Sequence, residues 1–195
     1  MINPDFSHTS GNQELKTVLL ADISCLFNAI KKSYNSPSNR STINMSIVKY
    51  MTKLKQEYSA DKAIGYDSKF PESFKNRKKS NNETNRLHED LKNIGFDTIS
   101  FTLVHRNSKQ GMFEKGVDVK LAMDATELIH SGIFHRLIIV SGDGDFYPVA
   151  ELAVRNHLEF IIIFPGKISS LYTKLPEVKI TKLPLSWVDW PEVCD

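Results

Sequence analysis

Two aspartates in a short, glycine-punctuated turn are the first residues in this sequence that could carry out chemistry. Asp143 and Asp145 follow the apolar, β-branched run 137–140. Such a run is typical of a strand buried on both faces of a parallel sheet, and sites in open α/β sheets lie just beyond the carboxyl ends of such strands. Two carboxylates about 4 Å apart repel each other by roughly 4 kcal/mol at an effective dielectric near 20. The turn therefore favours a compensating divalent metal, although Gly-Asp pairs also form ordinary turns and helix caps.

Two further aspartates are placed by the sequence pattern where such a site could form. Asp22 ends the apolar run 17–21, which is typical of another buried strand. Asp118 lies within an apolar face of helical period made by Val117, Leu121, Ala125, Leu128 and Ile129. A carboxylate on a core-facing arc is costly unless it is paired or metal-bound. Asp124, at the edge of the same arc, either supports a metal-binding side chain from behind or is a partner for a nearby base.

Four carboxylates from separate elements make a set of oxygen ligands that suits Mg²⁺ or Mn²⁺. Such metals activate a water and stabilise the leaving oxygen in phosphodiester hydrolysis. The sequence holds no CxxC, HExxH, Walker phosphate loop or GxGxxG pattern. Zinc, nucleoside-triphosphate and dinucleotide sites therefore lose support.

Composition bounds the class of protein. The 195 residues suffice for one well-cored domain, and 41% hydrophobic and 25% charged residues are ordinary for a globular protein. The net charge of +2 is too small to indicate nucleic-acid binding by itself. Cys25 and Cys194 are far apart and give no disulfide framework, and no secretory signal or membrane-spanning run is present. We expect a protein of the reducing cytoplasm with no membrane partner.

The order of elements predicts an α/β fold, a three-layer α/β/α sandwich with a mostly parallel central sheet. Strands are expected at 17–22, 63–70, 97–105, 136–140 and 158–164, with an edge strand at 178–181. Helices are expected at 23–32, from Thr42 onward with Thr42 or Ser41 as its cap, and at 83–93, 117–130 and 149–157, with a short one from Ser169.

Four segments are expected to lack regular structure. The basic segment Phe74 to Asn82 is either a solvated loop or a mobile loop that contacts a polyanion. Residues 109–115 are expected to form a loop between glycines. Residues 1–16 are expected to be a flexible leader and residues 184–195 a carboxyl-terminal tail, with the domain spanning 17–183.

The run from Lys115 to Asp124 (KGVDVKLAMD) precedes the run from Leu137 to Phe146 (LIIVSGDGDF). These two motifs, in this order, resemble the NYN domain family of the LabA/DUF88 type, within the PIN-like nuclease superfamily. The run from Val18 to Asp22 (VLLAD) is similar to that family's first strand and first catalytic aspartate. The resemblance extends from about Thr17 to Leu175. It implies a PIN-like fold and metal-dependent cleavage of RNA.

By this resemblance, Asp22, Asp118, Asp143 and Asp145 would be the catalytic and metal-binding residues. The substrate contacts would be Lys115, Asn28, Ser141, Lys75, Arg77, Lys78 and Lys79. The expected partner is single-stranded or structured RNA, and a homodimer is left open. One position departs from the family, since Cys25 stands where the family usually carries Asn three residues after the first aspartate. Asn28, one helical turn later, is the candidate substitute.

Two other classes of function compete with a ribonuclease. A nucleotide-sugar transferase could use Asp143-Gly144-Asp145 as a metal site, but the chain is short for that fold and the motif would not explain Asp118. A catalytically weak or inactive NYN scaffold that binds RNA or a protein is the stronger alternative. The loss of the family's Asn is what favours it.

Overall fold

The computed structural model describes residues 15–33, 39–71, 77–107, 111–113 and 116–187. Strands are β1 (Thr17–Asp22), β2 (Lys62–Lys69), β3 (Asp97–Thr102), β4 (Val104–Asn107), β5 (Gly111–Phe113), β6 (Arg136–Val140), β7 (Glu159–Ile163) and β8 (Lys179–Thr181). Helices are α1 (Ile23–Ser33), α2 (Arg40–Glu57), α3 (Lys78–Asn93), α4 (Val117–His130) and α5 (Tyr147–Arg155). Short 3₁₀ turns are η2 (Gly144–Phe146), η3 (Ser170–Lys174) and η4 (Leu185–Trp187).

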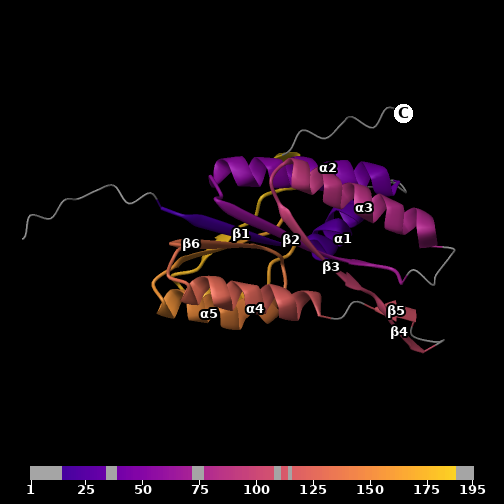
Figure 1. Cartoon of the computed structure of the whole chain (residues 1–195). Coiled ribbons are helices and arrows are strands. Elements are labelled where there is room, and N and C mark those ends of the chain that lie inside the picture. The colour runs from indigo at the N-terminus through magenta and orange to yellow at the C-terminus, as the bar shows by residue number, and fades with distance from the viewer. Residues whose placement is uncertain (1–14, 34–38, 72–76, 108–110, 114–115, 188–195) are drawn as a thin grey trace, which may run out of the picture.

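Six parallel strands form the central sheet, in the order β3-β2-β1-β6-β7-β8. All six residues of β1 are buried, as are the last four of β6 and of β7. Strands covered on both faces are continuous apolar runs because neither face meets water. The predicted fold class, a three-layer sandwich with a parallel sheet, is confirmed (Figure 1).

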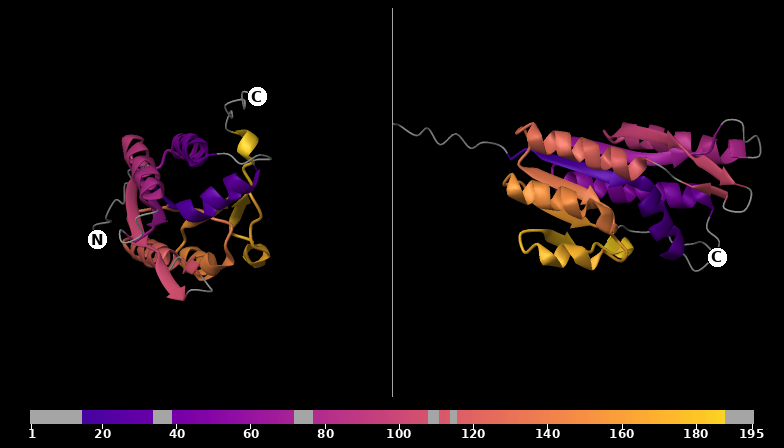
Figure 2. Two further views of the ribbon diagram at one scale, coloured as in Figure 1. Left: turned by 90° about the vertical axis from the view of Figure 1, so that its right-hand side faces the viewer. Right: turned by 90° about the horizontal axis from the view of Figure 1, so that it is seen from below.

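Helices cover both faces of the sheet. Helices α1, α2 and α3 pack on one face against Leu19, Ala21 and Ile138, while α4 and α5 pack on the other against Leu20 and Ile139. Neighbouring residues of one strand alternate between the two cores because side chains alternate across a strand. The left view of Figure 2, which looks along the strands, shows the sheet between the two helical layers.

A second, two-stranded sheet corrects the predicted loop at 109–115. Strand β4 pairs antiparallel with β5, and the hairpin projects from the carboxyl side of the sheet (Figure 1). The expected strand 97–105 therefore ends at Thr102, where the Leu103 N–H donates to the Lys69 carbonyl at 2.8 Å. Residues 108–110 and 114–115 lie outside the described part of the chain.

Two helix starts also differ from expectation. Helix α2 begins at Arg40, and its cap is Asn39 rather than Thr42 or Ser41, because the Asn39 side chain accepts from the Thr42 N–H at 2.8 Å. Helix α3 begins at Lys78, within the segment expected to be a loop. The Asn81 side chain bonds both the N–H and the carbonyl of Phe70, at 3.0 and 2.8 Å, and so anchors this polar first turn to the end of β2.

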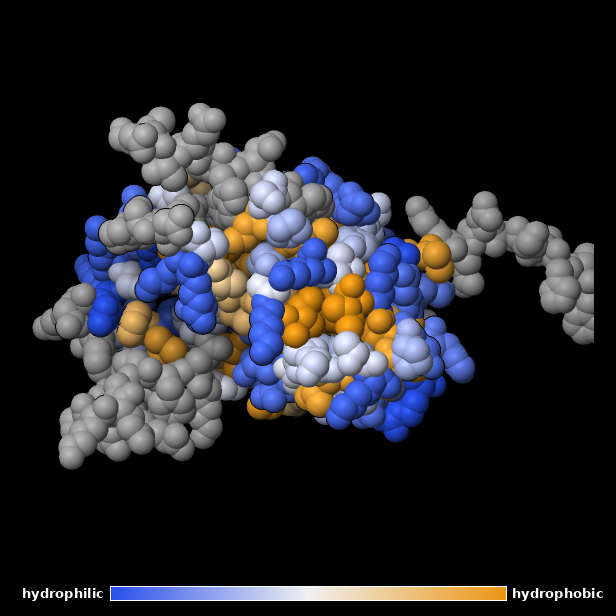
Figure 3. Space-filling model, turned by 180° about the vertical axis from the view of Figure 1, so that it is seen from behind, coloured by the Kyte–Doolittle hydropathy of each residue, from blue (hydrophilic) through white to orange (hydrophobic). Residues whose placement is uncertain are grey.

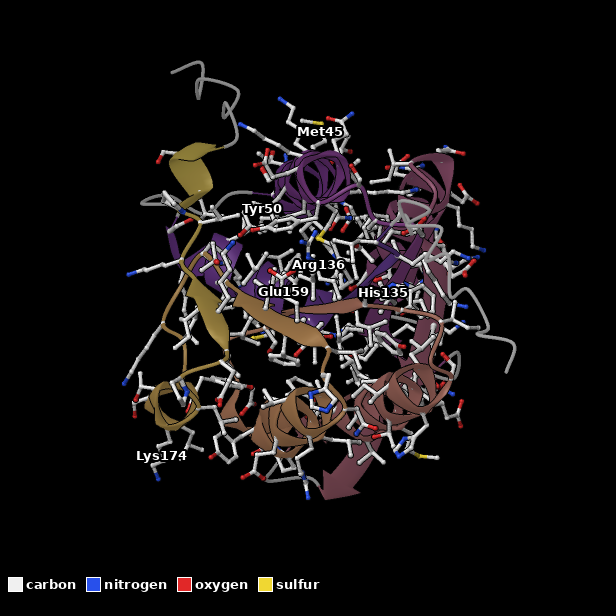
Figure 4. All side chains as sticks on the ribbon, turned by 90° about the vertical axis from the view of Figure 1, so that its left-hand side faces the viewer. Met45, Tyr50, His135, Arg136, Glu159 and Lys174 are labelled. Carbon is white, nitrogen blue, oxygen red and sulfur yellow. The ribbon has the colours of Figure 1, made fainter. Side chains whose placement is uncertain are left out.

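At the amino edge of the sheet, Arg136 on β6 and Glu159 on β7 pair side by side, with Nε and Oε2 2.5 Å apart (Figure 4). Seen from behind, the molecule exposes apolar surface bordered by hydrophilic side chains (Figure 3). Ile180 of the edge strand β8 is one of the exposed large apolar residues. Among the described residues, none of the helices combines the length and apolar character that a bilayer crossing requires.

Candidate active site

The strand order of the sheet has a topological switch point between β1 and β6. From β1 the chain continues to β2 and β3 on one side, and then returns to place β6 and β7 on the other. In open parallel sheets the loops at such a switch point diverge and leave a crevice at the carboxyl ends of the two strands. Asp22 is the last residue of β1, and Ser141 directly follows β6. Asp22 and the turn that holds Asp143 therefore follow neighbouring strands at this switch point, and we call this region the acidic crevice.

Asp22 is a buried carboxylate, with only 5% of the residue exposed. Its Oδ1 accepts a hydrogen bond from the Cys25 N–H at 2.8 Å, so it caps the first turn of α1. The amino-terminal end of a helix favours a negative charge, which offsets part of the desolvation cost of this group. Ser24, the second residue of α1, donates its hydroxyl to Asp67.

Cys25 joins the two sides of the crevice. Its half-buried side chain lies near Asp22 and Asp143 and takes part in hydrogen bonding with Ser141 and the Gly142 backbone. Burial, followed by the negative charge of Asp22, raises the pKa of the Cys25 thiol above its usual value. The thiol therefore stays protonated at neutral pH, as a neutral group between acids.

The turn after β6 is held by its own side chains. The Ser141 hydroxyl accepts from the Asp143 N–H at 3.2 Å, and Asp143 Oδ1 accepts from the Asp145 N–H at 3.0 Å. Tyr172 donates its hydroxyl to the Asp143 carbonyl at 2.6 Å. A side chain at Gly142 would collide with the Lys167 carbonyl oxygen, and one at Gly144 would come within 2.7 Å of the Ser169 hydroxyl. The glycines are needed for this close approach.

Asp143 and Asp145 are both exposed, but they differ in surroundings. Asp143 lies near Cys25, at the crevice. Asp145 lines a groove between α4 and α5, together with Met123 and Glu127. The membership of Asp145 in a common acidic site stays a prediction.

Helix α4 carries two aspartates with different environments. Asp118 lies half-buried in the first turn, on the arc that also holds the fully buried Leu121 and Ala125. This turn is at the carboxyl edge of the sheet, because α4 runs antiparallel to the strands (Figure 1). Asp124 is buried, with 8% exposed, and accepts from the Tyr66 hydroxyl at 2.8 Å and from the Lys120 ammonium group. Of the two roles weighed for Asp124, the structure shows the partner of a base.

Residues 16–175, most of the chain, match the NYN domain. The chain belongs to the NYN domain family. The matched region contains all four predicted acids and every predicted substrate contact. A search of the curated proteins gives no significant match to this chain.

This NYN domain is similar to several solved structures. A protein of unknown function from Vibrio parahaemolyticus is similar over 88% of this chain and 94% of its own, with 20% identity and a TM-score of 0.60. A mutant T5 5′-exonuclease is similar over 67% of this chain and 45% of its own, with 16% identity and a TM-score of 0.41. A bacteriophage T5 flap endonuclease in a complex with DNA and metal ions has 18% identity and a TM-score of 0.38, over 66% of this chain and 50% of its own.

The described part of the NYN domain contains no assembled set of metal ligands. Within the described ranges, no three His, Cys, Asp or Glu side chains are close enough together to hold a metal ion. The donor chemistry nevertheless fits Mg²⁺ or Mn²⁺, because Asp22, Asp118 and the turn that holds Asp143 bring carboxylates to the carboxyl edge of the sheet. Mg²⁺ keeps several of its waters and is commonly held by one or two carboxylates, so direct contact with three is not required.

The predicted substrate contacts of the NYN domain fall into three groups. Ser141 is fully buried within the turn after β6, and Asn28 is exposed on α1. Lys78 and Lys79 are exposed in the first turn of α3, and the preceding Arg77 places its guanidinium carbon 5.0 Å from the centre of the Phe70 ring. Lys75 and Lys115 lie outside the described residues.

Sequence reasoning missed a polar cluster beside the acids. Asp67, near the end of β2, is buried and accepts from the Ser24 hydroxyl at 3.1 Å, while His88 Nε2 lies 3.2 Å from its other oxygen. The position of Asp67 in the second half of the predicted strand 63–70 was the available signal. It is the same signal that singled out Asp22, but Asp67 carried no recognisable motif.

Proposed function

We propose that this NYN domain is a metal-dependent ribonuclease that hydrolyses RNA phosphodiester bonds at the β1–β6 crevice. The observation that supports the proposal is that Asp22 and Asp143 follow neighbouring strands at the switch point of a parallel sheet and both lie near Cys25. Asp118 approaches the same edge from the first turn of α4. We place the activity in the cytoplasm, where the free Cys25 thiol would stay reduced.

Asp22, Asp118 and Asp143 would hold Mg²⁺ or Mn²⁺, with Asp145 as a further candidate. A metal bound there would supply an activated water and stabilise the leaving oxygen. The chain itself fixes the positions of these acids. The cap to Cys25 orients Asp22, and the Tyr172 hydroxyl holds the backbone of Asp143. The exposed Arg77, Lys78 and Lys79 would contact backbone phosphates without reading sequence.

Cleavage of single-stranded and structured RNA in Mn²⁺ or Mg²⁺ tests the proposal. Asp118→Asn and Asp143→Asn should each lower the rate by at least about 100-fold, the usual cost of removing one group that stabilises the transition state. Asp97→Asn is the matched control, because Asp97 is an exposed aspartate at the amino end of β3. Cleavage that continues undiminished in EDTA would overturn the metal-dependent reading.

A non-catalytic NYN scaffold that binds RNA or a protein is the second candidate. Two observations favour it: Cys25 replaces the family's Asn, and the described residues contain no assembled metal-binding group. Under this alternative the chain would bind RNA, or a protein, without cleaving RNA in any divalent metal. The same assay, combined with an RNA-binding measurement, separates the two functions.

A further inference from the structure

A pocket of about 370 Å³ opens beside the acidic crevice, on the α1–α2–α3 side of the sheet. Its walls include Ser24, Phe27 and Asn28 from α1, Arg40 from α2, and Asp67 and Phe70 from the end of β2. Ser24 is two residues beyond Asp22, so the pocket and the proposed scissile site share the start of α1. A volume of this size is within the range of small-molecule sites, which start at about 300 Å³.

Arg40 brings an incompletely satisfied donor to this pocket. Its Nη2 donates to the Thr84 hydroxyl at 2.8 Å, and its guanidinium carbon lies 4.7 Å from the centre of the Phe27 ring. Its Nε is buried and finds no hydrogen-bond partner among the described residues, and the nearest Glu83 oxygen is 4.0 Å away. Because this Nε is inaccessible, a ligand in the pocket would meet the part of the Arg40 side chain that is exposed, 27% of its surface.

Asp67 gives the pocket the opposite charge. Its carboxylate is held by the Ser24 hydroxyl, by its contact with His88 and by the Ser68 N–H at 2.8 Å. A fixed carboxylate repels a phosphate group that would otherwise be drawn to Arg40. The pocket therefore fits a neutral ligand with both donors and acceptors on its edge, and with flat faces that can lie against Phe27 or Phe70.

We propose that this pocket receives one unstacked nucleobase of the RNA strand whose backbone crosses the acidic crevice. The inference rests on the proposed function for the identity of the strand. Proteins that bind single-stranded RNA stack splayed bases on aromatic rings or Arg guanidinium planes and bond their edges with polar side chains. The face of the Phe70 ring opposite the Arg77 guanidinium supplies the stacking surface, while the exposed Asn28 amide and the exposed part of the Arg40 side chain meet the edge of the base.

Abasic scanning tests the pocket. A fluorescent single-stranded RNA of about twelve nucleotides, the scale of a single-strand binding site, is prepared with one abasic position at a time. Affinity is measured by polarisation in EDTA, and cleavage is measured separately in Mn²⁺. One abasic position should weaken binding about tenfold, the typical value of a stacked base. The others should stay within about twofold.

Two variants assign that position to the pocket. Asn28→Ala and Phe70→Ala should weaken binding of the intact RNA, and the penalty at the sensitive position should shrink toward onefold, because the two changes remove the same contact. Arg155→Gln, in the groove between α4 and α5, is the control and should keep the full penalty. Thermal melts check that each variant is folded, and Asn28→Ala changes an exposed residue.

The outcomes separate this proposal from the ribonuclease assignment. Equal affinities for all abasic strands, no RNA binding, or a sensitive position that persists in both pocket variants would each overturn the nucleobase pocket. Absent cleavage with an intact abasic pattern would count against the ribonuclease alone and support the pocket.

Discussion

Asp22 combines two roles that substitution can separate. As a helix cap it needs only an acceptor oxygen, whereas as a proposed metal ligand it needs a negative charge. Asp22→Asn keeps the acceptor for the Cys25 N–H, so its stability should stay near wild type. Asp22→Ala loses the cap and should unfold more easily by about 1 kcal/mol. Both should lose activity. Urea denaturation followed by circular dichroism measures the difference, and equal stabilities of the two variants would contradict a capping role.

Tyr66 should make stability fall at alkaline pH. Burial, then its hydrogen bond to Asp124, raises the pKa of Tyr66 above the usual value near 10. The unfolded chain therefore loses this proton first, and stability that is complete below about pH 10 is lost as the pH rises toward the folded pKa. Urea unfolding between about pH 8 and pH 11 should show a steeper loss for wild type than for Tyr66→Phe. At the lower pH the variant should be less stable by about 1 kcal/mol. Parallel profiles would refute this linkage.

Residue pairs far apart in sequence explain what sequence reasoning missed. Tyr66 and Asp124 are 58 positions apart, and Ser24 and Asp67 are 43 apart. Periodicity reports which face of an element is buried, but not which polar group on another element will meet it. Sequence periodicity singled out Asp22 and Asp118 as candidate site residues because the first ends a strand and the second lies on a core-facing arc of a helix.

At the scale of elements, the first turn of α3 holds an electrostatic conflict. Lys78 and Lys79 lie at the positive end of the helix dipole, with no acidic residue in that turn. Lys78→Gln combined with Lys79→Gln should therefore raise stability by about 0.3–1 kcal/mol. The same change should weaken RNA binding and flatten its dependence on salt. Chemical denaturation and binding titrations at several salt concentrations measure these opposite effects.

Lys92, in the last turn of α3, is the matched control. Lys92→Gln should lower stability slightly, since a positive charge is favourable at that end, and should leave the salt dependence of RNA binding unchanged. If the dependence of RNA affinity on salt is unchanged in the Lys78 and Lys79 double variant, these two lysines do not contact RNA and are only solvated.

The elements that sequence predicted well carry local signals at both ends. Helix α4 was predicted with its observed bounds because its apolar period is clear, and Gly116 and Gly132, with φ of 97° and 64°, flank it. The start of α3 was missed because its first turn is polar and its anchor, Phe70, lies 11 positions before Asn81. The pairing of β4 with β5 was missed because the segment was read only by its glycines.

For the whole molecule, metal binding should appear as stability. A ligand that binds only the folded state stabilises it by about 2.7 kcal/mol at 100 times its dissociation constant. For a chain of this size each kcal/mol raises Tm by about 2–4 °C. Mn²⁺ should therefore raise the Tm of wild type and of Asp97→Asn by several degrees, and that of Asp118→Asn by less. Differential scanning fluorimetry with and without EDTA measures this. Equal responses of all three proteins would remove Asp118 from the metal site.

The parallel sandwich itself could be predicted, because apolar runs alternated with helical patterns along the chain. The strand order could not. Nothing local states that β6 lies beside β1, although this pairing forms the crevice. The positions of the acids at strand ends and on an apolar helix face supplied the expectation that they converge, and the sheet order shows that the strands of Asp22 and Asp143 are neighbours.

The burial of β1 and β6 has a consequence for hydrogen exchange. Their amides lie in the middle of the sheet, between two helical layers, and should exchange only through global unfolding, whereas β3 and β8 form the edges and should open first. Mass spectrometry of deuterated peptides should show this gradient. Asp22 and the turn after Val140 adjoin the most protected strands. Partial opening at the sheet margins would therefore leave the acidic crevice assembled, and its loss should coincide with loss of the whole fold.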